Sequence, residues 1–193
     1  MDNGIIRAPF RIGSTWMPSH LPRIIVHIHD DLSTLPGVED VAKQFELYKS
    51  YAFQIATDSE CDVSNFLPTL DEEDQKNFPP DHPFFGRDRL FYGEKIKAAN
   101  DPVFHVHLHH EETIYSWYDF DKADVFVSQW DCVSDAALVY AYLKTDSEDY
   151  HFLLLEVVAP GAHDLYKIDG KIAEWRHKAR NYRYSSGNPS LLL

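Results

Sequence analysis

The sequence predicts a single α+β domain, in which an antiparallel sheet of about four or five strands carries an N-terminal helix and a long C-terminal helix. The 193 residues suit one domain, and 44% of them are apolar, which is enough for a core. Short strand-like runs with short connections favour antiparallel pairing, with helices packed on one face. Two further segments have the three- and four-residue apolar spacing of amphipathic helices.

The first half of the chain alternates between irregular and regular patterns. Residues 1–22 hold prolines and no periodicity, so we expect an irregular N-terminal arm. Residues 23–29 (RIIVHIH) are β-branched and predict a strand, and the apolar spacing over 38–56 predicts a helix. Residues 57–83 are acidic and rich in proline, which predicts a long surface-loop insertion that can include a short helix.

The second half supplies most of the predicted sheet. Residues 103–108 alternate, with Phe104, Val106 and Leu108 on one face and His105 and His107 on the other. Further strands are predicted at 125–129, 136–143 and 152–158, the last of which is apolar on both faces and is expected to be central.

The last helix has one apolar stripe from Leu165 to Tyr182, with Gly170 as its weak point. We therefore expect one domain over 23–184, followed by a flexible tail over 185–193.

The charge is strongly acidic but unevenly distributed. The formal net charge of −13 argues against broad, unspecific nucleic-acid binding and is compatible with a basic partner. The segment between Leu165 and Tyr184, by contrast, contains six basic residues and only two acidic ones. Five of the six are candidates for a phosphate-facing or partner-facing role: Lys167, Lys171, Lys178, Arg180 and Arg183. The alternative is an ordinary solvated helix face.

The chain has only two cysteines, no apolar run long enough to span a membrane, and no basic segment followed by an apolar one at its start. These features predict a cytoplasmic protein with reduced thiols. A single disulfide bond between the two cysteines is the alternative that the sequence leaves open.

The histidine-rich run HVHLHH at 105–110 is the first candidate for chemistry. Histidines on one strand face can converge on a metal, can exchange protons near neutral pH, or can lie on a solvated sheet face. No second cluster of metal ligands stands out in the sequence.

Arg87, in a predicted Gly-Arg-Asp turn, is a candidate for clamping a phosphate, and the alternative is an Arg87–Asp88 pair that stiffens the turn. Ser134 and Asp135 are interpreted as turn residues rather than as part of a nucleophilic site. The sequence has no glycine-rich nucleotide loop and no paired-cysteine zinc motif.

Several motifs occur in a characteristic order: FGRD at 85–88, HVHL at 105–108, SDAALVY at 134–140, LLL at 153–155, then His163 and IAEWR at 172–176. Together they resemble the YafO family of bacterial type II toxins. The resemblance covers roughly residues 84–180, with a weaker match upstream in the strand at 23–29 and at 44–51.

The resemblance implies a RelE-like fold and a toxin that cleaves mRNA on the translating ribosome, without a metal or other cofactor. It implies a cognate antitoxin as partner, besides mRNA and the ribosome, with no membrane and no direct DNA contact. In such nucleases a ribose hydroxyl attacks the adjacent phosphate, and the protein supplies a base, an acid and a cation. The matching positions here are Arg87, His105, His107, His163 and Arg176. The resemblance also implies that the five basic candidates of the C-terminal region contact RNA: Lys167, Lys171, Lys178, Arg180 and Arg183.

The chain departs from the family in its N-terminal arm, its 57–83 insertion and its acidity. Two rival functions therefore stay open: an acidic binding or regulatory protein without catalysis, and a metal-dependent hydrolase that uses the histidine-rich strand.

Overall fold

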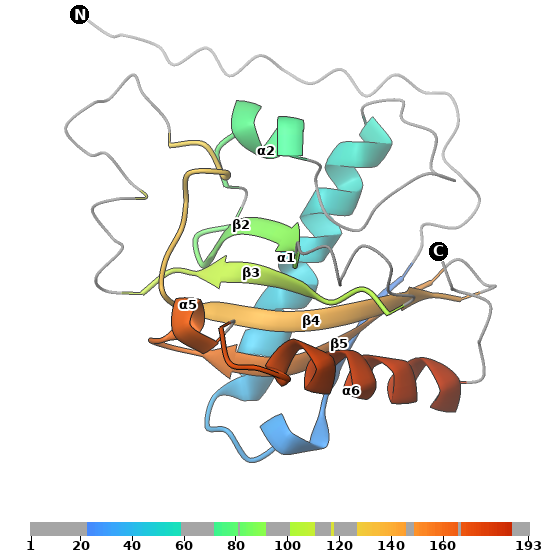
Figure 1. Ribbon diagram of the computed structural model, residues 1–193. Helices are drawn as coiled ribbons and strands as arrows, with labels where there is room; N and C mark the ends of the chain where they lie inside the picture. The colour runs from blue at the N-terminus through green and yellow to red at the C-terminus, as the bar shows by residue number, and fades with distance from the viewer. Residues whose placement is uncertain are drawn as a thin grey trace, which may run out of the picture.

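A five-stranded sheet lies between helices on its two faces (Figure 1). The computed structural model describes residues 23–58 (52–58 as backbone only), 72–80, 82–91, 101–110, 117, 127–145, 149–165 and 167–186. The strands are β1 (Ile24–Ile28), β2 (Phe85–Leu90), β3 (Phe104–Leu108), β4 (Ala137–Lys144) and β5 (Tyr150–Val158). The helices are η1 (Asp30–Leu32), α1 (Val38–Asp58), α2 (Glu72–Asn77), α5 (Ala162–Leu165) and α6 (Lys171–Ser185).

The strand order is β1-β5-β4-β3-β2, and the sheet is mixed. The β2–β3, β3–β4 and β4–β5 pairs are antiparallel, as predicted. The β1–β5 pair is parallel, which the sequence analysis did not predict. After β1 the chain crosses one face of the sheet as α1 and does not turn back in a hairpin, so β1 is free to pair in parallel with β5. The predicted central strand, β5, is interior, but β4 is the middle strand.

One face of the sheet is covered by α1, which crosses behind the strands in Figure 1. Phe45 is fully buried and its ring lies 5.8 Å from that of Phe85, 5.0 Å from Tyr140 and 5.5 Å from Phe152. Aromatic rings at these separations contribute beyond the area that they bury. Phe45 therefore ties α1 to three strands at once.

The other face is covered by α6, which runs in front of the sheet in Figure 1. Trp175 is buried against Phe91, with 5.4 Å between the ring centroids, and donates its indole N–H to Glu156 Oε2 at 2.7 Å. The expectation that the helices share one face was therefore wrong. The physical reason is that β4 is apolar and buried on both sides, so each side needs a covering layer.

The C-terminal helical region is divided in two at Gly170. This residue has a φ of 86°, a left-handed conformation that ends the continuity of a right-handed helix and favours glycine. The sequence predicted one continuous helix from Leu165 onward. The structure has instead a short helix, α5, that ends at Leu165, then a turn, and then α6, which begins at Lys171. Helix α2 lies within the predicted 57–83 loop.

Some predicted segments cannot be compared in full. Residues 1–22, much of 57–83 and most of the tail lie outside the described residues. In the strand predicted at 125–129, residues 127–129 are not strand, and the first two residues lie outside the described part of the chain. No helix among the described residues is long and apolar enough to cross a membrane.

An irregularity in β2 determines where its side chains point. The β2–β3 register shifts between Phe85 and Asp88, so both residues lie on the α1 face although they are three positions apart. Arg87 and Arg89 flank Asp88 and therefore point to the opposite face. Gly86 lies against the loop of Cys132, where a Cβ would be 2.2 Å from the Cys132 carbonyl oxygen. The predicted Gly-Arg-Asp turn is thus a bulged strand.

We expect Gly86→Ala to lower the free energy of unfolding by about 1–3 kcal/mol, because the added methyl overpacks a closed space. Urea denaturation of the full chain measures this value. Gly37→Ala is the control, since Gly37 has open space around it and a φ of 79°, so only backbone strain of about 1 kcal/mol is added. Equal losses for the two variants would contradict the close contact.

Candidate functional site

His105 and His107 lie on the α6 face of β3 and are each only 2% exposed. The alternation predicted for this strand is confirmed, since Phe104, Val106 and Leu108 pack on the α1 side. A solvated histidine face is excluded by the burial. The His105 ring stacks on Phe91 at 4.3 Å and meets the His107 ring edge-on at 5.5 Å. Burial lowers the pKa of His105 well below its usual value, so this ring is neutral at physiological pH.

His107 is oriented by the backbone of Ser134. Its Nδ1 lies 2.8 Å from the Ser134 carbonyl oxygen, to which a protonated Nδ1 donates, and 3.1 Å from the Ser134 backbone nitrogen, whose N–H donates to Nδ1 in the other tautomer. The shorter contact favours the tautomer in which Nδ1–H donates to the carbonyl and Nε2 keeps its lone pair. Burial lowers the pKa of His107 to about 4, and the bond to Ser134 opposes this shift. His107 is therefore a neutral imidazole with one nitrogen available as a base.

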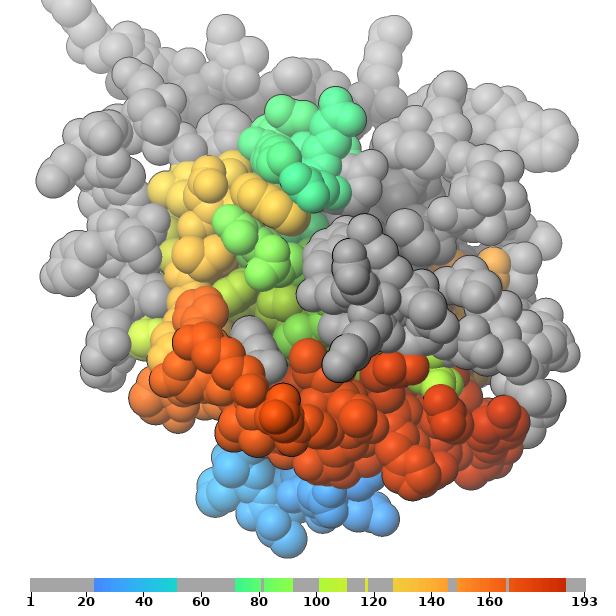
Figure 2. Space-filling model, viewed as in Figure 1, coloured from blue at the N-terminus to red at the C-terminus, as the bar shows by residue number. Residues whose placement is uncertain are grey.

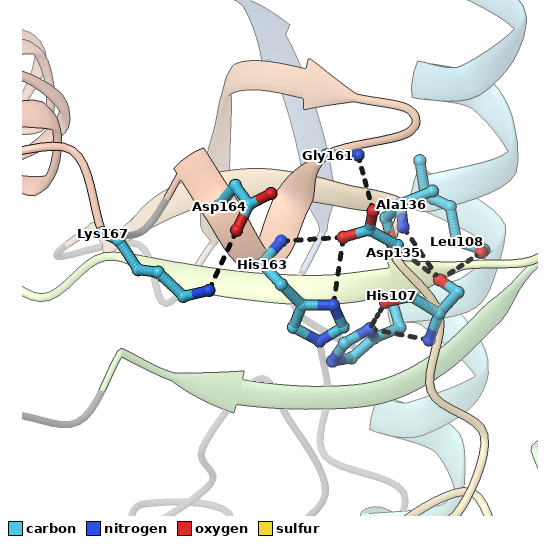
Figure 3. Close-up of polar contacts among 9 residues, drawn as sticks. His107, Leu108, Asp135, Ala136, Gly161, His163, Asp164 and Lys167 are labelled. Carbon is cyan, nitrogen blue, oxygen red and sulfur yellow. Dashed lines mark hydrogen bonds and ion pairs between the residues drawn. The ribbon is translucent and has the colours of Figure 1, made fainter.

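His163 approaches His107 from α5, as Figure 3 shows, with 5.9 Å between the ring centroids. Its Nδ1 lies 3.0 Å from Asp135 Oδ1, and its side chain is 57% exposed. The same carboxylate accepts the backbone N–H groups of His163 and Gly161, each at 2.9 Å. The His163 N–H is the main reason that the pKa of Asp135 lies below its usual value. Asp135, interpreted from sequence as a turn residue, thus orients His163.

Arg87 and Arg89 reach the same face from β2. The guanidinium of Arg87 lies over the Trp130 ring at 4.4 Å, and its Nε donates to the Trp130 carbonyl. Arg89 pairs with His105 across the strands, and its Nε lies 3.5 Å from His105 Nε2. Among the described residues neither arginine has a carboxylate partner. The alternative Arg87–Asp88 pair is not formed, because Asp88 binds Lys49 on the far side of the sheet.

We call Arg87, Arg89, His105, His107 and His163 the histidine–arginine cluster. Both arginines and His163 lower the pKa of His105 and of His107 by charge repulsion, which shows that the five groups share one region. In Figure 2, parts of β2 and β3 are visible between α2 and the α5–α6 segment. Arg89 was not singled out from the sequence, although its place two residues after Arg87 on a strand could have indicated it.

Arg176 lies on α6, one turn before Arg180. Arg180 and Arg183 both reach Asp101, three residues before β3 begins, so the four-residue spacing puts Arg176 on the side of α6 that faces this segment. Its Nε is buried and has no hydrogen-bond partner among the described residues. Of the five predicted catalytic residues, the structure brings together Arg87, His105, His107 and His163. Arg176 lies apart from them on α6.

The five predicted RNA-contacting residues all bind acidic side chains of the chain itself. Lys171 pairs with Glu156 and Glu174, and Lys178 with Asp31 and Glu174. Lys167 pairs with Asp164, and Arg180 with Asp101. Arg183 is buried and donates to the carbonyl oxygens of Pro102 and Tyr142. Lys171 ties α6 to β5, Lys178 ties it to η1, and Arg180 ties it to the segment before β3, whereas Lys167 lies outside α6 and is the most exposed of the five.

Within the described part of the chain, no three His, Cys, Asp or Glu side chains gather closely enough to hold a metal ion.

A family model described as toxin YafO of a type II toxin–antitoxin system matches residues 71–184, more than half of the chain. The chain belongs to the YafO toxin family. The match includes β2 to β5 and α6, and therefore every member of the histidine–arginine cluster. Membership makes this YafO-family protein a type II toxin and implies a cognate antitoxin as partner. No curated protein and no solved structure matches the chain.

The burial of His107 predicts a pH-dependent stability of this YafO-family toxin. Its usual pKa of 6.5 in the unfolded chain falls to about 4 on folding, so between these values the unfolded state binds more protons. Stability is therefore lost as the pH falls through this window, by up to about 3 kcal/mol from this residue.

Urea denaturation at pH 7 and at pH 4.5 measures the effect, and His107→Asn should flatten the dependence, because Asn keeps the donor to Ser134 but does not titrate. The same slope in the parent and in His107→Asn would show that His107 does not carry the effect.

Proposed function

We propose that this toxin is an endoribonuclease of the cytoplasm, which cleaves mRNA on the translating ribosome and needs no metal ion. The observation that carries the proposal is the approach of His163 to His107 beside two arginines that have no carboxylate partner among the described residues. Two imidazoles can serve as the base and the acid, and a guanidinium as the cation, in the attack of a ribose hydroxyl on a phosphate. The family match supports the toxin, and the chemistry is our inference from the site.

His107 is the proposed general base. Its Nε2 can accept the proton of the ribose 2′-hydroxyl as the oxygen attacks the adjacent phosphorus. The pKa of about 4 keeps the ring unprotonated at neutral pH, and the negative charge of a bound phosphate raises this pKa toward the neutral range in which a general base works best. The hydrogen bond to the Ser134 carbonyl holds the His107 ring in one orientation, so the base is already aligned when the RNA binds.

His163 is the proposed general acid. Asp135 holds its Nδ1, so that Nε2 can donate a proton to the 5′-oxygen that leaves the phosphorus. Its exposed side chain can recover a proton from solvent after each turnover. Asp135 acts only through His163 in this mechanism and is therefore a positioning residue.

Arg87 is the proposed cation that binds the phosphate, with Arg89 beside it. As negative charge develops on the phosphate oxygens, a guanidinium already in place stabilises it without reorganisation. Trp130 holds Arg87 from the opposite side through its ring and carbonyl. For His105, which is as buried as His107 and whose ring stacks on Phe91 and meets the His107 ring edge-on, we propose a supporting role beside the base.

The basic residues of the C-terminal region have a narrower proposed role. Surface ion pairs contribute little to stability and exchange partners easily. Lys167 can therefore leave Asp164 for an RNA phosphate, whereas the more enclosed Lys171, Lys178 and Arg183 are placed to hold α6. For Arg180 and Arg176 we propose a contact at the edge of the bound RNA.

His107→Asn should reduce cleavage of ribosome-bound mRNA by roughly 10²–10⁴-fold, because the donor to Ser134 is kept while the basic nitrogen is removed. Arg87→Ala should reduce it by roughly 10²–10³-fold through loss of the cation. The measurement is the single-turnover rate on translating ribosomes, together with growth and mRNA integrity after induction in a host cell.

The matched control is His177→Asn, an identical change on an exposed position of α6 whose ring contacts Asn181. It should leave the rate unchanged. Parent-level cleavage by His107→Asn would remove His107 from the mechanism. Loss of cleavage on adding a chelator would favour the metal-dependent hydrolase, and intact mRNA with the parent toxin would favour the binding protein.

A further inference from the structure

Asp88 is fixed by its side chain and its main chain together. Its carboxylate accepts from Lys49 Nζ at 2.5 Å, from the Tyr140 hydroxyl at 2.7 Å and from the Tyr48 hydroxyl at 3.1 Å. Its backbone N–H donates to Gln75 Oε1 at 2.9 Å, and its carbonyl accepts from Gln75 Nε2 at 2.7 Å. One residue of β2 is thereby held by α1, α2 and β4.

The bulge next to Asp88 is held by the same network. Gln129 is fully buried and donates from Nε2 to the Gly86 carbonyl at 3.0 Å and to the Tyr48 hydroxyl at 2.8 Å. The backbone N–H of Arg87 donates to the Cys132 carbonyl at 2.9 Å. The main chain around Arg87 therefore has little freedom to slip in register.

A buried ion pair is an expensive way to fill this core. The side chains of Lys49 and Asp88 are both completely inaccessible to solvent. Burial lowers the pKa of Lys49, and the carboxylate of Asp88 opposes that shift. Apolar pairs of similar volume in such positions are often as stable or more stable, so stability alone does not explain these charges. Fixed hydrogen-bond directions, which apolar side chains lack, are what the pair adds.

The residues on either side of Asp88 benefit from that fixation. Arg87 and Arg89 project together toward His105 and His107, and neither forms an ion pair with a carboxylate among the described residues, although the charges of Asp131 and Glu72 act to raise the pKa of Arg87. Two guanidinium groups with one residue between them repel each other, which a loosely held strand would relieve by twisting. A rigid Asp88 prevents this and keeps both cations on one side.

We propose that the buried Lys49–Asp88 pair is a positioning device that holds Arg87 and Arg89 side by side as a two-cation site for RNA phosphate oxygens. This inference rests on the proposed function and deepens it, because it adds Arg89 to the phosphate site and gives the α1 core a role in catalysis. Lys49 and Asp88 touch no substrate and act only through the arginines.

The test is a double-mutant cycle on the full chain. The paired variant Lys49→Met/Asp88→Leu removes both charges, so no lone buried charge is left to unfold the protein. We expect it to stay folded with a lower thermal midpoint, because the buried hydroxyls of Tyr48 and Tyr140 lose Asp88 as a partner, and to lose roughly 10²-fold in single-turnover cleavage, the size of effect produced by small misplacement of catalytic groups. Its affinity for ribosomes carrying an mRNA with 2′-O-methyl riboses, which cannot be cleaved, should fall as well.

The cycle combines this paired variant with Arg87→Ala/Arg89→Ala. If the pair acts through the arginines, adding the paired variant to the arginine variant should cause little further loss. Losses that multiply, or a paired variant with the parent's rate, would overturn the inference. Lys49→Met/Asp88→Asn keeps the shape of Asp88 and is carried through the same cycle, so that misfolding of one variant does not remove the test.

A matched control is the Arg23–Asp149 ion pair, whose Asp149 side chain is also buried and which joins the start of β1 to the start of β5. Asp149→Asn should lower stability without changing the cleavage rate. A parent toxin that neither binds nor cleaves ribosomal mRNA would refute the proposed function itself. An active parent whose paired variant is equally active would refute the positioning role alone.

Discussion

The arrangement of this toxin depends on one buried ion pair, between Lys49 of α1 and Asp88 of β2. It joins helix α1 to the edge strand β2, and hydrogen bonds of both residues with the Tyr140 hydroxyl extend the connection to the middle strand, β4. Because side chains alternate along a strand, fixing Asp88 toward α1 fixes Arg87 and Arg89 on the opposite face of the sheet, where His105 and His107 lie. The core on one face therefore determines the chemistry available on the other.

The same layering explains how an acidic chain can carry a basic site. The net charge of −13 is spread over the whole sequence, whereas the histidine–arginine cluster is a local group on one face. The basic residues of the C-terminal region are balanced by acids from distant segments, such as Asp31, Asp101 and Glu156. The cluster is different, because no carboxylate within ion-pairing distance neutralises Arg87 or Arg89 in the described part of the chain. Local pairing, and not net charge, determines where a phosphate can bind.

Much of this arrangement follows from the sequence, because periodicity is a local property. The alternation in β3 and the apolar stripes of α1 and α6 were predictable in this way, whereas the family resemblance, and not periodicity, suggested grouping Arg87 with His105, His107 and His163. The parallel β1–β5 pair was not predictable, since it joins residues more than a hundred positions apart. Nor were the bulge at Asp88, the role of Asp135 or the burial of His105, which depend on contacts with Gln75, the α5 turn and Phe91. The Gly170 break was visible as a weak point, but its left-handed backbone was not.

The central claim is that two histidines transfer protons during attack by a ribose hydroxyl, and the chemistry of the product ends tests it most directly. The measurement is mass spectrometry of the mRNA fragments that the purified toxin releases on translating ribosomes. Attack by the 2′-hydroxyl predicts an upstream fragment that ends in a 2′,3′-cyclic phosphate and a downstream fragment that begins with a free 5′-hydroxyl. A 3′-hydroxyl and a 5′-phosphate at the cut would instead show that water, and not the ribose, attacks the phosphorus, and would contradict the account.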